Sequence, residues 1–326
     1  MNILITGATG AIGPNVVLAL HQAGHQIRTF SVDAPAAGMF PQDVEVLSGD
    51  ITDIPAVRSA MQGMDAVVHM AALLHIVNPQ PEMRARYEHI NIRGTETVVG
   101  AAVHGGVGRI VLFSTIAVYG PSCGQVLDEM SPANPDTMYA QTKRAAERIV
   151  LEAMGAGDQP LGTVLRLGAV YGSRIKGNYE RLVRALARQR FLPVGAGCNR
   201  RTLVYDKDVA RAAVLAVSHP AAAGRIFNVT DGQYYTLNEI IQSICTALGR
   251  TPPRWSLPLA PTRSAIKIIE KVCRFFGYKP PVTQESLDKY TEDIAVDGNL
   301  IQRELGFVPQ YDLHAGWEDA LREMRR

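Results

Sequence analysis

A tyrosine and a lysine stand four residues apart in Met138-Tyr-Ala-Gln-Thr-Lys143, inside a stretch with a helical pattern. This spacing puts both side chains on one face of a helix, one turn apart. The phenol of a free tyrosine titrates at about pH 10, too high for a base at neutral pH. A nearby ammonium favours the phenolate, so the pKa of Tyr139 should fall far enough for proton transfer. The pair predicts a proton donor and acceptor for a substrate hydroxyl.

The position of this pair in the chain strengthens the prediction, because the same spacing is common on exposed helix faces without a role. The preceding strand pattern ends in Phe113-Ser-Thr115, one element before the tyrosine. Either Ser114 or Thr115 would then offer a hydroxyl to the same substrate oxygen.

The chain begins with a strand pattern, a glycine turn and a helical pattern. Residues 2–5 have the pattern of a buried strand, Gly7, Gly10 and Gly13 follow, and Pro14 opens an apolar helix. Such glycines permit a tight turn, a close approach of the backbone to a pyrophosphate, and close helix–strand packing. The N–H groups and positive dipole of the helix then face the anion. An ordinary glycine-rich turn is the alternative, and the strand before and helix after favour dinucleotide binding.

The elements that must position these residues alternate through the first half. Strand patterns occupy 26–32, 44–47, 66–70, 110–114, 163–167 and 226–229, and helical patterns occupy 53–62, 82–104 and 137–154. This alternation predicts an α/β fold, a Rossmann-type doubly wound parallel sheet covered by helices on both faces. Ligands of such sheets bind at the carboxyl ends of the strands.

The remaining chain has a different pattern, mostly helices joined by proline-bearing loops. We predict a dinucleotide-binding domain of residues 1–167, to which 202–229 return, and a smaller, mostly helical substrate domain of 168–201 and 230–326. Residues 262–276 combine apolar residues at helical spacing with four basic residues. A helix lying on a membrane surface would have this pattern, but such a stripe more often packs on its own domain.

Composition excludes several classes of protein. The 326 residues include 33 basic and 31 acidic ones, and this balance gives no electrostatic case for binding nucleic acid or an anionic membrane. The four cysteines lie far apart without metal-ligand spacing, which indicates reduced thiols, no metal site and a cytoplasmic protein. No uncharged apolar run reaches the length of about 18 residues that a membrane span needs.

With these motifs the chain resembles the extended short-chain dehydrogenases/reductases, which include NAD-dependent sugar-nucleotide epimerases and dehydratases. The resemblance covers nearly the whole length. Its motifs are Thr6-Gly-Ala-Thr-Gly-Ala-Ile-Gly13, Gly49-Asp-Ile-Thr-Asp53, His69-Met-Ala-Ala72, Asn91-Ile-Arg-Gly-Thr95, Phe113-Ser-Thr-Ile-Ala-Val-Tyr-Gly120, Tyr139-Ala-Gln-Thr-Lys143, Arg166-Leu-Gly-Ala-Val-Tyr-Gly172, Arg201 to Ala210 and Phe227 to Gly232.

The resemblance implies a set of cofactor-binding residues. These are Gly7, Thr9, Gly10, Ala11, Ile12, Gly13, Asp50, Ile51, Ala71, Ala72, Asn91, Tyr139 and Lys143. By the same resemblance Asp50 and Ile51 contact the adenine, Lys143 holds the nicotinamide ribose, and Asn91 braces the active-site helix. His69 is expected to be a strand-end residue with a satisfied ring.

The choice of cofactor depends on the end of the second strand, where an acidic residue binds both ribose hydroxyls and repels a 2′-phosphate. The expected position holds Ser31, and Asp33 follows two residues later. We therefore predict NAD, bound through Asp33, without excluding NADP.

The resemblance also implies the catalytic set, in which Thr115 pairs with Tyr139 at the reacting oxygen and Lys143 supports the tyrosine. Ser114 and Thr115 are expected at the substrate. Arg201 falls where the epimerases hold a substrate diphosphate, a task suited to a planar guanidinium. The alternative for Arg201 is a solvated charge in a basic run.

Departures from the family pattern narrow the function. Dehydratases carry acidic residues just after the catalytic Ser or Thr, where this chain has Ile116 and Ala117, so elimination of water is not expected. Many sugar-nucleotide enzymes have Asn where Ala169 stands, and the epimerases carry a second arginine near 286–288, where this chain has none. The tail is also similar to that of hydroxysteroid dehydrogenases.

Three functions remain compatible with these residues. The first is an NAD-dependent nucleotide-sugar epimerase acting at C4 through a 4-keto intermediate. The second is a reductase or dehydrogenase of a keto-sugar or hydroxysteroid-like substrate, and the third is a non-catalytic dinucleotide sensor.

The resemblance implies a homodimer formed through the helices near 82–104 and 137–154. In the substrate loops, His75 is either a substrate contact or, more simply, a surface histidine.

Overall fold

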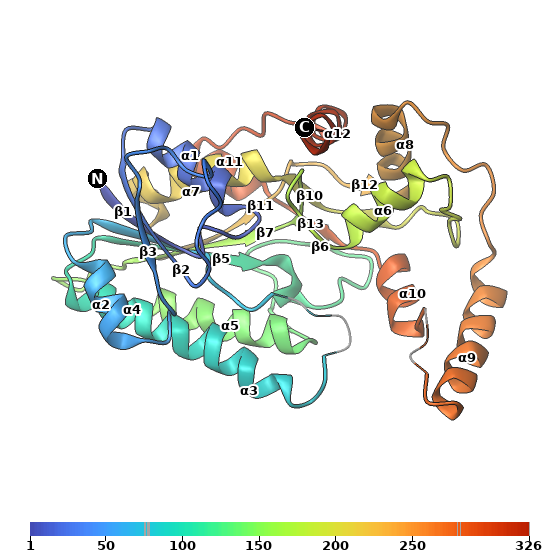
Figure 1. Cartoon of the computed structure of the whole chain (residues 1–326), viewed down its shortest axis with the longest axis horizontal. Helices are drawn as coiled ribbons and strands as arrows, with labels where there is room; N and C mark the ends of the chain where they lie inside the picture. Colours follow the sequence, from blue (N-terminus) through green and yellow to red (C-terminus); the bar gives the residue numbers. More distant parts are fainter. Residues whose placement is uncertain (75, 77–78, 279, 281, 326) are drawn as a thin grey trace.

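The computed structural model describes residues 1–74, 76, 79–278, 280 and 282–325 (Figure 1). His75 lies outside these residues. In the described part, seven strands form one parallel sheet in the order β11-β7-β5-β4-β1-β2-β3. They are β1 Asn2–Thr6, β2 Gln26–Ser31, β3 Glu45–Ser48, β4 Ala66–His69, β5 Arg109–Thr115, β7 Gly162–Leu167 and β11 Arg225–Val229. The order reverses at β1, so the crevice beyond β1 and β4 is the expected ligand site.

Helices cover both faces of the sheet (Figure 1). One face carries α1 Gly13–Gln22, α7 Asp206–Ser218 and α11 Asn299–Leu305, and the other carries α2 Ile54–Met61, α4 Gly94–His104 and α5 Met138–Leu151. Alternate residues of a strand point to opposite faces. Accordingly Ile3 and Ile5 belong to the first core and Leu4 to the second. The predicted Rossmann-type fold is confirmed.

The helix predicted over 82–104 is divided into three segments. These are α3 Met83–Tyr87, a π-helical segment Glu88–Arg93 and α4. Gly94, at the start of α4, lies tightly on Ile51, since a Cβ there would come within 2.4 Å of the isoleucine Cδ1. The π-helical segment forms a wider turn that contains Asn91. The helical pattern of the sequence does not reveal this wider turn.

A third hydrophobic cluster lies beyond the carboxyl ends of the strands and is centred on Trp317, which stacks on Tyr171 at 4.6 Å between ring centroids. It is built by α6 Asn178–Ala187, α8 Leu237–Leu248 and α12 Leu313–Met324, with the short strands β8 Ala169–Tyr171 and β10 Leu203–Tyr205. Two further strand pairs join distant segments: β9 Arg200–Arg201 with β12 Tyr235–Thr236, and β6 Val126–Leu127 with β13 Ala295–Val296. Residues of α11 pack instead in the core of the main sheet, although the sequence places them in the substrate domain.

Two helices at the edge of the molecule complete the chain, α9 Leu259–Phe275 and α10 Gln284–Thr291 (Figure 1). Only Ile266 and Glu270 of α9 are buried. The expectation that the apolar stripe of this helix packs on its own domain is therefore wrong for most of its residues. The reason is that α9 contacts the rest of the protein along one narrow side.

The remaining predictions from composition concern single residues and elements. All four cysteines are unpaired thiols, as predicted. Within the described ranges no group of three or more His, Cys, Asp or Glu side chains could hold a metal ion, and none of the helices there combines the length and apolarity needed to cross a bilayer.

Candidate active site

The glycine turn after β1 is tight enough to explain its composition. Gly7 has a φ of +72°, and a Cβ there would lie 2.7 Å from the backbone of Ala71, which follows β4. A Cβ on Gly13 would lie 1.9 Å from the carbonyl oxygen of Ala8. No side chain in the described part of the protein caps the first turn of α1, which has Pro14 near its start. The N–H groups of Gly13 and Asn15 donate to the carbonyls of Gly10 and Ile12, and the positive end of the helix dipole at this tight turn fits a dinucleotide pyrophosphate.

Gly13→Ala is expected to raise the Kd of NAD about tenfold or more and to lower the free energy of unfolding by about 1–3 kcal/mol. The new methyl group meets backbone, so α1 must move away from β1. Isothermal titration with NAD and urea unfolding measure both effects. Gly100→Ala is the matched control, because nothing lies within 4 Å of its Cβ position. Equal Kd values for the two variants would contradict the close-packing argument.

The remaining residues of the cofactor set lie around this turn. The N–H of Thr9 donates to Ser31 at the end of β2 (3.4 Å), and Ile12 is the N-cap residue of α1. Ala11 lies between them in the turn, and Ala72 follows Ala71 beyond β4.

The residues predicted for the adenine end follow β3. Asp50 is exposed, and one carboxylate oxygen accepts from the N–H and hydroxyl of Thr52. The side chain of Ile51 is buried against Gly94, so any contact of this residue with an adenine must come from its backbone.

Tyr139 and Lys143 lie on α5, whose N-cap Thr137 accepts from the N–H of Ala140. Burial, with a smaller effect of Tyr87, raises the pKa of Tyr139 to about 12. The predicted lowering of this pKa by the lysine is therefore wrong, because burial disfavours the charged phenolate more than nearby charges favour it. Burial also lowers the pKa of Lys143 to about 8, and Glu147 partly offsets this.

Lys143→Met is expected to stabilise the protein while abolishing its activity. The pKa of about 8 in the folded state lies below the ordinary value of 10.5, so the folded protein binds this proton less tightly than the unfolded chain. The charged lysine therefore opposes folding fully below about pH 8, and this penalty disappears as the pH rises towards 10.5. The variant should gain up to about 3 kcal/mol at neutral pH and less at alkaline pH.

Urea unfolding across this pH range measures the gain. The exposed Lys176 provides a control in Lys176→Met. A variant at residue 143 that is less stable than the wild type at neutral pH would contradict the burial argument.

Glu147 is a site residue that the sequence analysis missed. It is fully buried one turn beyond Lys143, and it accepts from Ser114 (2.6 Å), from Arg144 (2.9 Å) and bidentately from Arg166 (2.9 and 2.7 Å). The sequence contained a signal for Glu147, because residues 139, 143 and 147 are spaced four apart and therefore share one helix face. This cluster fixes α5 against β5 and β7.

The same cluster changes the role of Ser114. Its side chain is 4% exposed and its hydroxyl donates to the buried glutamate, so it points into the core instead of towards a substrate as predicted. Strand alternation explains the difference, because Thr115 must then point to the other side. Thr115 is partly exposed at the end of β5, and its hydroxyl oxygen accepts from the N–H of Ala117 (3.2 Å). Of the two hydroxyls, only that of Thr115 is accessible.

Two buried side chains hold the loop after β4 in place. Asn91 accepts from the N–H of Leu73 (2.7 Å) and donates to the Leu73 carbonyl and to Thr142 of α5 (3.0 Å). The amide thus braces α5 and has no polar atom left for direct contact with a cofactor. The ring of His69 contacts Thr6 (2.7 Å) and Thr95 (3.1 Å), so the prediction of a satisfied ring is confirmed.

A cavity of about 460 Å³ opens beside Tyr139. Residues from three segments line it: Ile76, Pro79, Gln80, Tyr87, Asp136, Thr137, Met138, Tyr139, Glu285 and Lys289. Its volume is within the range of small-molecule sites. Because α10 supplies Glu285 and Lys289, the C-terminal part of the chain forms one wall of this cavity.

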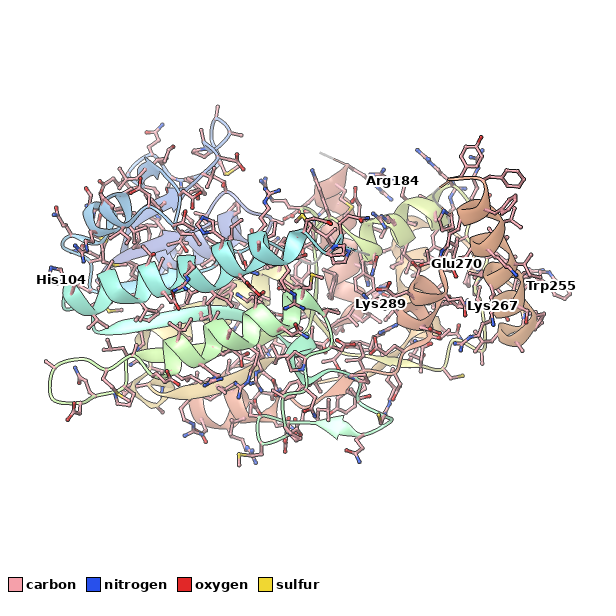
Figure 2. The ribbon with its side chains drawn as sticks, turned by 90° about the horizontal axis from the view of Figure 1, so that it is seen from below. His104, Arg184, Trp255, Lys267, Glu270 and Lys289 are labelled. Carbon is pink, nitrogen blue, oxygen red and sulfur yellow. The ribbon has the colours of Figure 1, made fainter. Side chains whose placement is uncertain are left out.

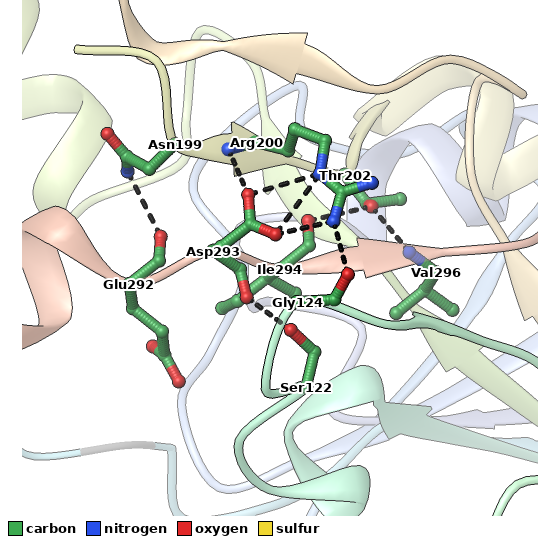
Figure 3. Close-up of polar contacts among 9 residues, drawn as sticks. All are labelled: Ser122, Gly124, Asn199, Arg200, Thr202, Glu292, Asp293, Ile294 and Val296. Carbon is green, nitrogen blue, oxygen red and sulfur yellow. Dashed lines mark hydrogen bonds and ion pairs between the residues drawn. The ribbon is translucent and has the colours of Figure 1, made fainter. Parts of the chain in front are cut away.

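The basic pair at residues 200 and 201 forms the short strand β9, and Figure 3 shows the polar contacts of Arg200. Arg200 donates from its backbone and guanidinium to Asp293 and from the guanidinium to the carbonyl of Gly124 (2.9 Å). Arg201 is half-buried and donates to the carbonyls of Lys289 and Tyr290 at the end of α10. It is thus not a solvated charge, and one guanidinium nitrogen is used to hold α10.

The fold and the glycine turn after β1 define an NAD-binding enzyme with a Rossmann-type domain. The chain belongs to the NAD dependent epimerase/dehydratase family, whose family model matches residues 3–230. It is an NAD-dependent enzyme of the extended short-chain dehydrogenase/reductase type, as the resemblance implied.

Relatives span nearly the whole chain. An N-acetyl-alpha-D-glucosaminyl-diphospho-ditrans,octacis-undecaprenol 4-epimerase of Escherichia coli O157:H7 is 26% identical over 98% of this chain and 94% of its own length. A 3 beta-hydroxysteroid dehydrogenase/Delta 5-->4-isomerase of Mycobacterium tuberculosis is 26% identical over 95% of this chain and 86% of its own. MoeE5 in complex with UDP-glucose and NAD has a similar fold, with a TM-score of 0.79 and 24% identity over 100% of this chain and 99% of that one.

Proposed function

We propose that the protein is an NAD-dependent nucleotide-sugar epimerase that acts at C4 through a 4-keto intermediate. The observation that carries the proposal is the cavity beside Tyr139. The hydroxyl of Thr115 is partly exposed at the end of β5, and residues 116 and 117 are apolar. Oxidation and reduction of a substrate hydroxyl need the hydroxyls of Tyr139 and Thr115. Elimination of water needs an acid or base at residues 116 and 117, which are apolar here. A relative that is a 4-epimerase supports the choice of reaction.

In the proposed reaction Tyr139 takes the proton of the C4 hydroxyl while Thr115 holds the same oxygen. NAD, when bound, supplies the acceptor and donor of the hydride. Lys143 remains charged below about pH 8 and is proposed to favour the phenolate once substrate and NAD are bound, against the burial that raises the pKa of Tyr139 to about 12. The flat keto-sugar then turns within the cavity, and Tyr139 returns the proton after reduction of the other face. Arg201 is proposed to bind the diphosphate with the guanidinium nitrogens that do not hold α10.

We also propose roles for Asp33 and for a second copy of the chain. Asp33 is exposed two residues beyond β2 and would bind the adenosine ribose, so the Kd of NAD should be lower than that of NADP. Asp33→Asn should bring the Kd values of NAD and NADP closer together. A lower Kd for NADP than for NAD in the wild type would refute the assignment of Asp33. A cytoplasmic homodimer through α4 and α5 is part of the proposal, and light scattering would test the dimer.

The second candidate is a reductase or dehydrogenase of a keto-sugar or hydroxysteroid-like substrate. The observation that favours it is the engagement of Arg201 with α10, which leaves one guanidinium nitrogen fewer for a phosphate. The hydroxysteroid dehydrogenase among the relatives supports it too. This reaction releases an oxidised or reduced product and must exchange its cofactor.

One experiment separates these candidates. The purified protein is incubated with UDP-glucose, UDP-galactose and other UDP- and GDP-sugars, and the products are resolved by ion-pair chromatography. Interconversion of C4 epimers without net reduction of NAD is the expected result. Net formation of NADH with a sterol or sugar would instead select the second candidate. NAD binding without turnover of any substrate would select the remaining possibility, a non-catalytic dinucleotide sensor.

A further inference from the structure

The outer side of α9 carries an apolar stripe that the rest of the described chain leaves exposed. Ile268, Val272 and Phe275 follow a spacing of four and three, so they lie on one side of the helix. Their exposed fractions are 64%, 48% and 82%. Soluble monomers rarely leave a continuous apolar surface of this kind without a partner.

Aromatic residues extend this stripe beyond both ends of the helix. Trp255, which precedes α9, is 81% exposed and projects from the outer margin of the molecule (Figure 2). Phe276 and Tyr278, which follow it, are exposed as well. We call Trp255, the stripe and these two residues the apolar edge.

A basic stripe runs beside the apolar one. Lys267, Lys271 and Arg274 have the same spacing, shifted by one residue, and all three are exposed. Among the described residues the two lysines form no ion pair. The net charge of the whole chain is only +2, but residues 259–275 contain four basic residues and one acidic one.

The single acidic residue of the helix faces inward. Glu270 is buried between α9 and α10, where it accepts from the backbone and side chain of Gln284 (both 3.3 Å) (Figure 2). With Ile266 it forms the narrow contact that attaches α9 to the protein. The exposed surface of α9 is thus apolar and basic, without a carboxylate from the helix itself.

We propose that α9 and the apolar edge dock the protein on the surface of an anionic bilayer. Apolar and aromatic side chains would enter the interface between headgroups and acyl chains, and the basic stripe would face the anionic headgroups. A second copy of this chain suits the surface less well, since a two-fold contact would bring two basic stripes together. The inference concerns a surface and does not depend on which reaction the active site performs.

Docking would also set the orientation of the active site. Helix α10, which packs on the inner side of α9, contributes Glu285 and Lys289 to the wall of the cavity. The cavity would therefore lie one helix layer from the lipid surface.

Co-sedimentation with vesicles tests the proposal. The full chain is mixed with vesicles of phosphatidylcholine containing about one third phosphatidylserine and, separately, with phosphatidylcholine alone. Binding to the anionic vesicles is expected, with weaker binding to the neutral ones and a marked decrease at high salt. Absence of binding to the anionic vesicles at low salt would overturn the proposal.

Paired variants assign the binding to the two stripes. Ile268→Ser with Phe275→Ser should lower the partition into anionic vesicles about tenfold or more, and Lys267→Gln with Lys271→Gln should remove the preference for anionic lipid. Matched controls are Val308→Ser, at a valine that is 64% exposed elsewhere, and Arg303→Gln, which should bind as the wild type. NAD affinity and the unfolding midpoint must be unchanged in each variant. Wild-type binding by the first pair would refute the assignment.

Fluorescence gives a direct readout, since the chain has two tryptophans and Trp317 is 1% exposed. The emission of Trp255 should shift to shorter wavelength with anionic vesicles, and Trp255→Phe should abolish the shift. Sedimentation velocity tests the competing occupant. Self-association that Phe275→Ser removes, together with no vesicle binding, would assign the surface to a second copy and overturn the proposal.

Discussion

Tyr139→Phe is expected to lower kcat by about 10²–10⁴-fold while leaving the Kd of NAD nearly unchanged. The change removes the hydroxyl that we propose exchanges a proton with the substrate, and keeps the ring that lines the cavity. Because burial raises the pKa of this phenol to about 12, the protein gives up no charge that contributes to folding. Initial rates of the epimerisation assay and titration with NAD measure the two effects.

A matched control separates the proton transfer from the loss of a tyrosine. Tyr234→Phe removes a hydroxyl from a partly exposed tyrosine outside the cavity, so its kcat should equal that of the wild type. A Tyr139→Phe enzyme that keeps more than about a tenth of the wild-type kcat would show that another group transfers the proton.

Glu147→Ala is expected to lower the free energy of unfolding by about 3–5 kcal/mol. The carboxylate is fully buried and neutralises Arg166, which is 2% exposed and whose pKa is raised by this contact. Its removal leaves a buried guanidinium and the hydroxyl of Ser114 without their acceptor. Because Glu147 lies one turn from Lys143, activity should fall as well.

Urea unfolding at neutral pH measures this loss. Glu152→Ala, at an exposed glutamate at the end of the same helix, should change stability little. The double variant Glu147→Met with Arg166→Met should recover much of the loss, because it removes both buried charges. A single Glu147→Ala variant that loses less than about 1 kcal/mol would mean that water reaches the cluster.

Several features could be predicted because they depend on neighbours in the sequence. The turn from β1 to α1 needs glycine at residues 7 and 13, where a Cβ would meet backbone. Alternating strand and helix patterns are sufficient for a parallel sheet with two covered faces. The spacing of Tyr139 and Lys143 likewise fixes a shared helix face without any tertiary contact.

Contacts between distant segments decided the orientation and the pKa of the side chains in the candidate site. The strand pattern left both Ser114 and Thr115 open as the hydroxyl at the substrate, although the resemblance assigned the catalytic role to Thr115. The buried glutamate of α5 shows that Ser114 points inward. Helical spacing could not reveal that burial would raise the pKa of Tyr139, because desolvation depends on the whole surrounding structure.

Two helical segments illustrate the same division. A π-helical turn positions Asn91 between the loop after β4 and α5, and only its partners Leu73 and Thr142 reveal that role. The periodicity of α9 determined an amphipathic helix, but not what covers its apolar side. The sequence by itself thus determined the local elements and the chemistry they carry. The tertiary structure decided which side chains are buried, paired or exposed, since these properties depend on contacts between segments far apart in the chain.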